Sequence, residues 1–274
     1  MLRPAGRRVG MAAVAGLAAV AASATLIAVS EAGPGDLAPD LVTMAIGDDD
    51  LRIGPERGKI VLRFTNEIGN RGNGPLEIEP SPASQGCDGD ADPDNDRDAT
   101  QRIFTDSNGT GAYERGIDAV ASERRFGCMR YHAAHDHWHV LDIATYELRR
   151  ERSGRVLLRS RKIGFCLTDA RPAFESDATP LATTYPINPP GIMGCQSIST
   201  QGISAGWADA YVLTLPGQSL DVTELPRGSY CLTTRADPTG MLDELDELNN
   251  VRRVRLALRP EEPSVRKLPG PCRA

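Results

Sequence analysis

The sequence has no histidine outside one short run and lacks several common catalytic signatures. All four histidines lie between positions 132 and 139. No Gly-rich phosphate loop, GxSxG turn or HExxH pattern occurs, so the sequence shows none of the usual marks of phosphate binding, serine hydrolysis or zinc proteolysis. No CxxC pair occurs either, which argues against a metal site built from cysteine thiolates.

Helical periodicity is also missing. No stretch of about 11 residues or more has apolar residues at a convincing 3.6-residue spacing. Short apolar, β-branched runs separated by turn residues predict instead an all-β fold, a single β-sandwich domain with long irregular loops. We expect strands at 59–66, 75–79, 138–149, 155–167, 211–215, 219–223, 229–235 and 251–258, the two at 219–223 and 229–235 forming a hairpin, and a loop-rich region over 80–125.

The sequence has fewer basic than acidic residues, 31 Lys and Arg against 37 Asp and Glu. The formal net charge is −6. A protein with this balance is not expected to bind nucleic acid, whereas basic or amine-bearing ligands are compatible with it.

The first 32 residues resemble an export signal. Three arginines precede a long Ala-rich apolar stretch, and small residues before Gly33 offer a cleavage site. A cut after Ala24 is an alternative, and so is retention of residues 9–29 as an uncleaved membrane anchor. We expect a secreted protein in which residues 33–274 form one catalytic domain, with no other membrane segment.

An even number of cysteines in an exported chain predicts disulfides. Six cysteines allow 15 pairings. We expect Cys166 to pair with Cys195, and the sequence leaves the other pairings open. The remaining four are Cys87, Cys128, Cys231 and Cys272.

The histidine run predicts a metal site. His135, His137 and His139 alternate, and on a strand such residues lie on one face about 6.6 Å apart. Three imidazoles at this spacing can converge on one ion at bond lengths of about 2 Å. His132 has the opposite parity and is expected to point elsewhere unless the strand bends. Three histidines also suit catalytic zinc, but no glutamate stands at helical spacing among them to act as a base.

The histidine run is one of a series of short motifs that follow each other along the chain. The others are PDLV at 39–42, LRF at 62–64, KIGFCL at 162–167, QGIS at 201–204, DAY at 209–211, LDVT at 220–223, PRGSY at 226–230 and NNV at 249–251. In this order they resemble the catalytic domain of the lysyl oxidase family, over most of the chain after the export signal.

The resemblance implies copper bound by His135, His137 and His139. It also implies an organic cofactor, lysyl tyrosine quinone, made from Lys162 and Tyr211. Copper and O₂ can oxidise a phenol to a quinone, and a deprotonated amine can add to that quinone. The implied reaction converts peptidyl-lysine or another primary amine to an aldehyde, consumes O₂, and releases ammonia and hydrogen peroxide.

The family also has a calcium site built from oxygen ligands. The matching residues in this sequence are Asp40, Leu41 through its carbonyl, Glu244, Asp246, Asn249 and Asn250.

One departure affects the reaction itself. Animal members have a further histidine shortly after the copper strand, often considered as the base, and this chain has none there. Asp142 and His132 are candidates for that role.

A rival interpretation from another class is an exported copper- or calcium-binding β module that never forms the quinone. The natural amine and the oligomeric state are not predicted.

Overall fold

The architecture comes from a computed structural model whose secondary structure, over the part it describes, consists of strands without helices. The described residues are 33, 35–81, 86–89, 95–134, 136–160, 164–174, 184–185 and 200–272. The predicted export signal therefore lies outside the described residues.

The strands form four antiparallel sheets. The largest has seven strands, β12 (Gly164–Phe165), β9 (His137–Leu141), β8 (Ala119–His132), β7 (Asp96–Thr105), β6 (Leu76–Pro80) and β14 (Gln201–Ile203) in that order, with β1 (Asp36–Leu37) paired to β7. The five-stranded sheet has the order β11 (Val156–Arg159), β10 (Ala144–Arg150), β17 (Gly228–Ala236), β18 (Val251–Arg259) and β19 (Ser264–Lys267).

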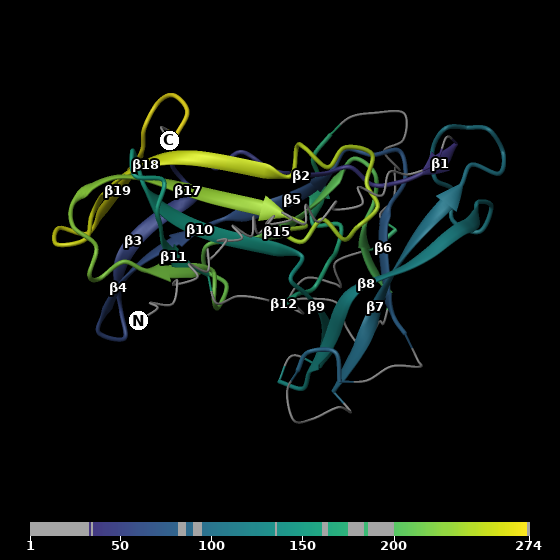
Figure 1. Ribbon diagram of the computed structural model, residues 1–274, viewed down its shortest axis with the longest axis horizontal. Helices are drawn as coiled ribbons and strands as arrows, with labels where there is room; N and C mark the ends of the chain where they lie inside the picture. Colours follow the sequence, from purple (N-terminus) through teal and green to yellow (C-terminus); the bar gives the residue numbers. More distant parts are fainter. Residues whose placement is uncertain are drawn as a thin grey trace, which may run out of the picture.

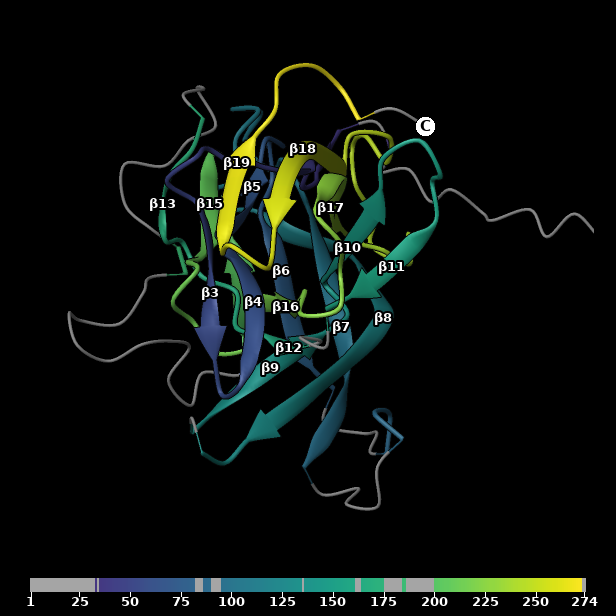
Figure 2. The same cartoon turned by 90° about the vertical axis from the view of Figure 1, so that its left-hand side faces the viewer.

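Two smaller sheets complete the fold. One joins β13 (Arg171–Pro172), β15 (Trp207–Tyr211), β5 (Asn66–Asn70) and β2 (Leu41–Thr43), and the other joins β16 (Ser219–Asp221), β4 (Lys59–Phe64) and β3 (Leu51–Glu56). In Figure 1 the long β7–β8 hairpin lies at the end of the molecule opposite to β3 and β4. Figure 2, viewed from the β3–β4 end, shows the five-stranded sheet running from β19, beside β3, round to β11.

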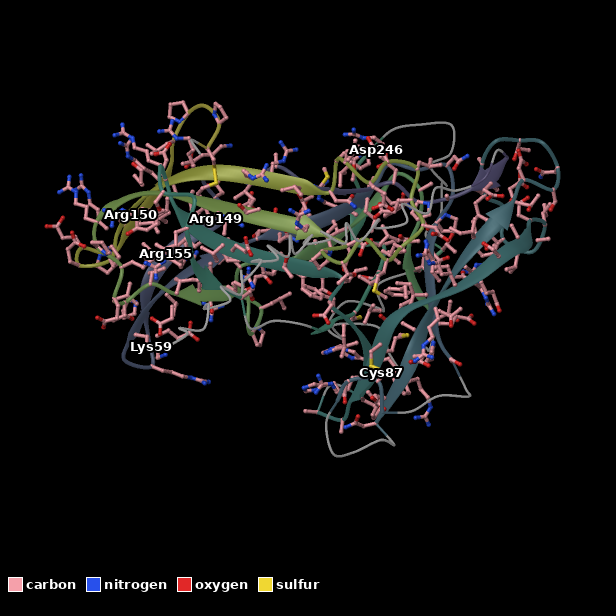
Figure 3. The ribbon with its side chains drawn as sticks, viewed as in Figure 1. Lys59, Cys87, Arg149, Arg150, Arg155 and Asp246 are labelled. Carbon is pink, nitrogen blue, oxygen red and sulfur yellow. A yellow bond between two sulfur atoms is a disulfide. The ribbon has the colours of Figure 1, made fainter. Side chains whose placement is uncertain are left out.

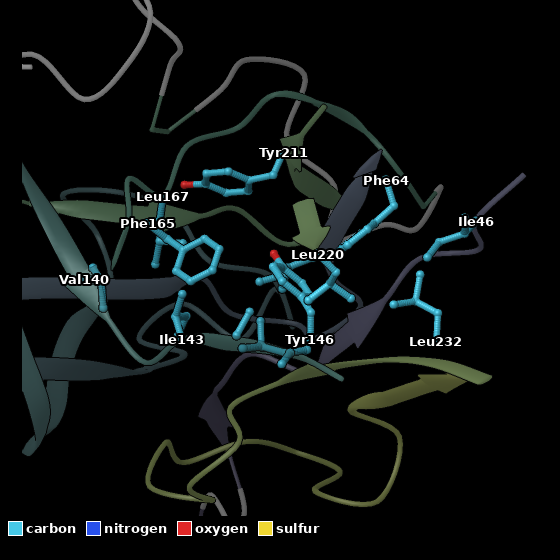
Figure 4. Close-up of a cluster of buried hydrophobic side chains, with 14 of the residues drawn as sticks. Ile46, Phe64, Val140, Ile143, Tyr146, Phe165, Leu167, Tyr211, Leu220 and Leu232 are labelled. Atoms are coloured by element: carbon cyan, nitrogen blue, oxygen red, sulfur yellow. The ribbon is translucent and has the colours of Figure 1, made fainter. Parts of the chain in front are cut away.

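The core follows from the alternation of side chains along the strands. In β10, Ala144, Tyr146 and Leu148 are buried while the residues between them are partly exposed, as the two-residue period of a half-buried strand requires. The rings of Phe64, Tyr146, Phe165 and Tyr211 follow one another edge to face through this core, with centroid separations of 5.0, 6.2 and 4.9 Å (Figure 4). Tyr211 is therefore part of the core, not of the surface.

The all-β prediction is confirmed, but several element predictions are wrong in detail. Residues 138–149, expected as one strand, are two strands in different sheets, because the chain turns at Asp142, which has a φ of 55°. The strand expected to begin at Tyr211 and run to 215 instead ends at Tyr211, as β15. The pair expected as a hairpin, 219–223 and 229–235, separates: β16 pairs with β4, and β17 with β10 and β18.

The disulfide prediction is confirmed in kind. Cys87–Cys128 holds the chain before β7 against β8, and Cys231–Cys272 holds the chain after β19 against β17. Cys166 is also disulfide-bonded. Its expected partner Cys195 lies outside the described residues.

The second of these bonds is expected to contribute measurably to stability. Replacing both Cys231 and Cys272 by serine should lower the free energy of unfolding by about 2–4 kcal/mol, because a loop closure is removed from the unfolded chain. Urea denaturation of the wild type and the double variant measures the difference. An unchanged midpoint and slope would contradict a stabilising role for this bond.

Candidate metal centre and tyrosine site

The histidines are brought together by the β8–β9 hairpin. His132 ends β8 and faces His137 across the ladder. The turn between them is closed by the Asp136 N–H, which donates to the His132 carbonyl at 2.9 Å, and Asp136 has a φ of 57°. The Asp136 carboxylate also accepts a hydrogen bond from Tyr131. The hairpin register and this hydrogen bond thus place His132 opposite His137.

His137 and His139 lie on one face of β9 with their rings turned toward each other. Their Nε2 atoms are 2.9 Å apart. Two nitrogens that each lie about 2.0–2.1 Å from one ion at a right angle are about 2.9 Å apart. His137 is buried and His139 is half-buried, so a bound ion would be partly shielded from water. The separation is compatible with a shared metal ion, and it is also that of a hydrogen bond between one protonated and one bare Nε2.

The prediction for the other two histidines needs revision. His132 does not point elsewhere: its ring stacks on that of His139, with centroids 5.2 Å apart. The parity argument was wrong because His132 belongs to the neighbouring strand, where the hairpin places it opposite His137. The predicted ligand His135 lies outside the described residues.

Gly164 allows β12 to lie against the histidine site. A Cβ atom at Gly164 would be 3.0 Å from Nδ1 and 3.1 Å from Cβ of His139, closer than side chains normally approach. Glycine is therefore needed for this contact. The predicted cofactor residue Lys162 lies outside the described residues, but covalent geometry keeps its Cα within about 7 Å of that of Gly164.

Tyr211 lies on the other side of the β9–β12 pair. Phe165 pairs with Val140, and both side chains point into the core, away from the face that carries His139. The Tyr211 ring packs on Phe165, and its hydroxyl donates a hydrogen bond of 2.6 Å to the carbonyl of Cys166. The phenol is thus hydrogen-bonded to the main chain of Cys166, which is two residues after Gly164 in the sequence.

The environment of Tyr211 strongly disfavours its phenolate form. Burial raises the pKa of Tyr211 well above its usual 10, and the nearby Asp209 and Tyr146 raise it further, while the hydrogen bond to Cys166 acts in the opposite direction. Asp209 is itself 3% exposed. Sequence reasoning missed Asp209, although its place two residues before a candidate cofactor tyrosine on a strand puts both on one face.

The six predicted calcium residues meet at one place. The N–H of Leu41 donates to Oε2 of Glu244, and Nδ2 of Asn250 donates to Oε1 of the same carboxylate at 3.0 Å. Asn249 donates to Asp40 at 2.6 Å and to Asp246 at 3.3 Å. Asp246 is labelled in Figure 3, on the loop before β18 that also carries Glu244, Asn249 and Asn250.

The donors of this set suit a hard cation. Oδ1 of Asn249 and Oδ1 of Asn250 are buried and accept no hydrogen bond from any described residue. Burial raises the pKa of Glu244 to about 9 and also raises that of Asp40, although Arg71 and the hydrogen bond from Asn249 act in the opposite direction on Asp40. Oxygen-only ligands with excess negative charge are what Ca²⁺ prefers.

Two further acidic residues, not predicted from the sequence, adjoin this set. Carboxylate oxygens of Asp237, Glu244 and Glu247 lie within 4.8 Å of one another. Burial and the neighbouring carboxylates of Asp237 and Asp243 raise the pKa of Glu247 to about 7. Asp237 and Glu247 therefore add negative charge beside Glu244, beyond that of the predicted ligands.

A cavity of about 480 Å³ opens beyond the end of β9. Its lining includes the candidate base Asp142 together with Asp98 and Asp237. Asp98 forms an ion pair with Arg125, and Asp142 is exposed. Leu141, two residues after His139 on β9, also lines it, whereas no described histidine does.

The fold and the hairpin define an all-β, disulfide-bonded protein with a histidine pair spaced for a metal ion. The chain belongs to the lysyl oxidase family, whose model matches residues 112–267, more than half of its length. It is 28% identical over 124 residues to human lysyl oxidase homolog 1, covering 45% of this chain and 19% of that protein. It is 27% identical over 137 residues to rat protein-lysine 6-oxidase, covering 50% of this chain and 30% of that protein. The matched region thus spans less than a third of either relative.

The described part of the chain contains no helix with the length and apolar character needed to cross a membrane.

Proposed function

We propose that the chain is an exported, copper-dependent amine oxidase that converts primary amines, including peptidyl-lysine, to aldehydes with release of ammonia and hydrogen peroxide. Membership of the lysyl oxidase family supports the reaction class. The observation that carries the proposal is the 2.9 Å separation of the His137 and His139 Nε2 atoms, beside which Gly164, two residues after Lys162 in the sequence, packs on His139.

The proposed ligands of copper are His135, His137 and His139. When formed from Lys162 and Tyr211 with copper and O₂, lysyl tyrosine quinone would supply the electron-accepting carbonyl that condenses with the amine. The chain itself would bind the metal through imidazole nitrogens, hold the Tyr211 ring against Phe165 and exclude water from it.

For the cofactor to form, Tyr211 must approach the histidine face. β12, which lies between the Tyr211 ring and the side of His139, is a two-residue strand at the edge of its sheet. This movement would give up at least the hydrogen bond to the Cys166 carbonyl and the edge-to-face packing on Phe165.

The rival function is an exported copper- or calcium-binding β module without a quinone. One observation favours it: the ring of Tyr211 packs on the core side of β12, not on the side of His139. Both functions keep the histidine pair, so metal binding alone does not separate them.

Amine-dependent peroxide release separates them. Protein produced with copper in air should release hydrogen peroxide from a primary alkylamine and from a lysine-containing peptide, and it should react stoichiometrically with phenylhydrazine, which traps quinone carbonyls. An N,N-dimethylated amine is the control and should release none. A copper-loaded protein that neither binds phenylhydrazine nor releases peroxide would support the binding module.

We also propose that Asp40, the Leu41 carbonyl, Glu244, Asp246, Asn249 and Asn250 bind calcium. The unpartnered amide oxygens of Asn249 and Asn250 support this. Such an ion would join the start of β2 to the chain before β18.

Calcium is expected to raise the melting temperature. Binding adds stability as the free ion exceeds its dissociation constant, by about 2.7 kcal/mol at a 100-fold excess. Glu244→Gln should remove most of this gain, because the buried carboxylate is the central ligand. Asp221→Asn, which removes an exposed carboxylate paired with Lys59, is the matched control and should keep the gain. Equal calcium responses in all three proteins would contradict the site.

A further inference from the structure

The five-stranded sheet holds an excess of positive charge in a chain that is negative overall. Its segments with their turns, 144–159, 228–236 and 251–267, contain 12 arginine and lysine residues against four acidic residues, whereas the formal net charge of the chain is −6. In Figure 3 side-chain nitrogen atoms gather at the end of the molecule where Arg149, Arg150 and Arg155 are labelled. Positive charge is thus concentrated on one part of the surface.

One face of this sheet packs on the core and the other points away from it. Tyr146 on β10, Leu232 on β17 and Leu256 on β18 are fully buried. Residues in the alternating positions leave the opposite face. On β18 these include Arg253 and Arg259, which are exposed. The face that points away from the core is therefore the one that carries these arginines.

Part of the charge on this outer surface, called here the arginine face, is neutralised within the sheet. Glu147 pairs with Arg149 and Arg159. Glu151 pairs with Arg255. The strand registers assign these arginines to the arginine face: Arg149, Arg159, Arg235, Arg253, Arg255, Arg259 and Arg266. Two glutamates therefore serve a larger set of arginines.

Three members of the arginine face have no acidic partner in the described part of the chain. Arg235, Arg253 and Arg266 are exposed and form no ion pair with any described residue. The β17–β18 register makes Arg235 and Arg253 diagonal neighbours, about 7–8 Å apart. Like charges at this distance repel each other, so an acidic group placed between them would be held by both.

The spacing of the arginine face matches that of an extended polypeptide. Alternate residues of a strand, such as Arg253 and Arg255 on β18, lie about 6.4–6.8 Å apart. Alternate side chains of an extended peptide have the same spacing and leave the same side of the chain. Guanidinium groups bind carboxylates through two parallel hydrogen bonds. A segment with acidic residues at alternate positions therefore fits this face in both charge and spacing.

We propose that the arginine face binds an extended acidic segment of another polypeptide, with glutamate or aspartate at alternate positions. Arg235, Arg253 and Arg266 would take the carboxylates, while Glu147 and Glu151 hold the neighbouring arginines in place. Positive charge collected on one face also speeds the encounter with an acidic partner. This docking surface depends neither on copper nor on the proposed oxidation of amines.

Other occupants fit the arginine face less well. Its described strands place no aromatic side chain on it, whereas proteins that bind single-stranded nucleic acid stack the bases on aromatic rings. No large apolar side chain of these strands is exposed, so a membrane would be held by charge alone. In a second copy of the chain many acidic groups, Asp98, Asp237 and Glu244 among them, are buried and cannot reach it.

The test measures, with the full chain and its disulfides intact, the fluorescence anisotropy of a labelled peptide in which glutamate and serine alternate. A peptide of the same composition with all its glutamates in one block is the spacing control, since an extended block turns half of its carboxylates away. The variant Arg235→Gln/Arg253→Gln removes two unpaired charges from the arginine face. Arg52→Gln/Arg57→Gln removes two exposed charges from the β3–β4 hairpin and is the matched control.

We expect the wild type to bind the alternating peptide more tightly than the block peptide, and more weakly as salt is added, because salt screens exposed charges. Arg235→Gln/Arg253→Gln should lose about 5- to 25-fold in affinity, since each exposed ion pair contributes a factor of up to about five. The control double variant should change by less than about twofold. Both variants should melt like the wild type, because exposed substitutions rarely alter stability.

Equal losses of affinity in the two double variants would overturn the docking surface, since binding would then follow net charge alone. Equal binding of the alternating and block peptides would overturn it too, because the spacing would then play no part. Tighter binding of phosphatidylglycerol vesicles or of an oligonucleotide, or self-association that Arg235→Gln/Arg253→Gln abolishes, would overturn it in favour of another occupant. All these measurements use metal-free protein, so their failure leaves the proposed amine oxidase function intact.

Discussion

Tyr211→Phe is expected to bind copper as well as the wild type and to oxidise no amine. Phenylalanine keeps the ring that packs on Phe165 but lacks the oxygen from which a quinone is built. Because the cofactor carries the chemistry, turnover should fall to the uncatalysed level, a loss of about 10⁶-fold or more. Lys162→Ala should have the same effect, since no amine is then present to join the ring. Metal analysis and peroxide release measure the two properties separately.

Tyr230→Phe is the matched control for this substitution. Tyr230 is another fully buried tyrosine, on β17, and its hydroxyl donates to the carbonyl of Pro226. Its phenylalanine variant should lose some stability and keep amine oxidation. Full peroxide release from Tyr211→Phe or from Lys162→Ala would show that the cofactor residues are wrongly assigned.

His137→Ala should remove most of the copper. The partners of metal ligands are typically worth 10–100-fold in affinity, so loss of a ligand should cost more than about 100-fold. His137 is buried, and its Nε2 faces that of His139, so alanine there removes one of the two described nitrogens that face each other. Competition with a chelator of known copper affinity gives the change.

His132→Ala separates ligand loss from damage to the hairpin. Its ring stacks on His139 from β8, so it is expected to orient the site without holding the metal. Its effect on copper affinity should stay within about 10–100-fold, the range for such partners. Equal losses in both variants would mean that His132 is a ligand too, and unchanged copper in His137→Ala would contradict the hairpin geometry.

Local sequence patterns predicted which residues form strands better than they predicted how the strands pair. β4, β6, β17 and β18 lie close to their expected positions, because alternating apolar residues report burial directly. β16 and β17, expected as a hairpin, lie in different sheets, since pairing is decided by contacts between residues distant in the sequence.

The region 80–125 shows why polarity misleads. It was expected to be loop-rich, yet it contains β7 and the first half of β8. Asp96, Asp98 and Gln101 on β7 are buried, and their charges and amides are met by backbone N–H groups, Arg125 and the main chain of Asp243. A strand with buried, paired polar side chains lacks the alternation of apolar and polar residues by which a strand is recognised in a sequence.

The candidate site was predictable where it depends on spacing along one strand and not where it depends on tertiary packing. The i, i+2 spacing of His137 and His139 correctly placed both rings on one face. The stacking of His132 on His139 needed the β8–β9 register, and the packing of Tyr211 on Phe165 needed strands from two different sheets. Neither is visible in any short window of sequence.

The most direct test of the account is peptide mapping of copper-loaded, aerated protein by mass spectrometry. The account predicts one covalently joined species that contains both Lys162 and Tyr211, with trypsin unable to cut after Lys162. It also predicts that this species is missing from metal-free protein. Recovery of the two peptides separate and unmodified from fully copper-loaded protein would contradict it.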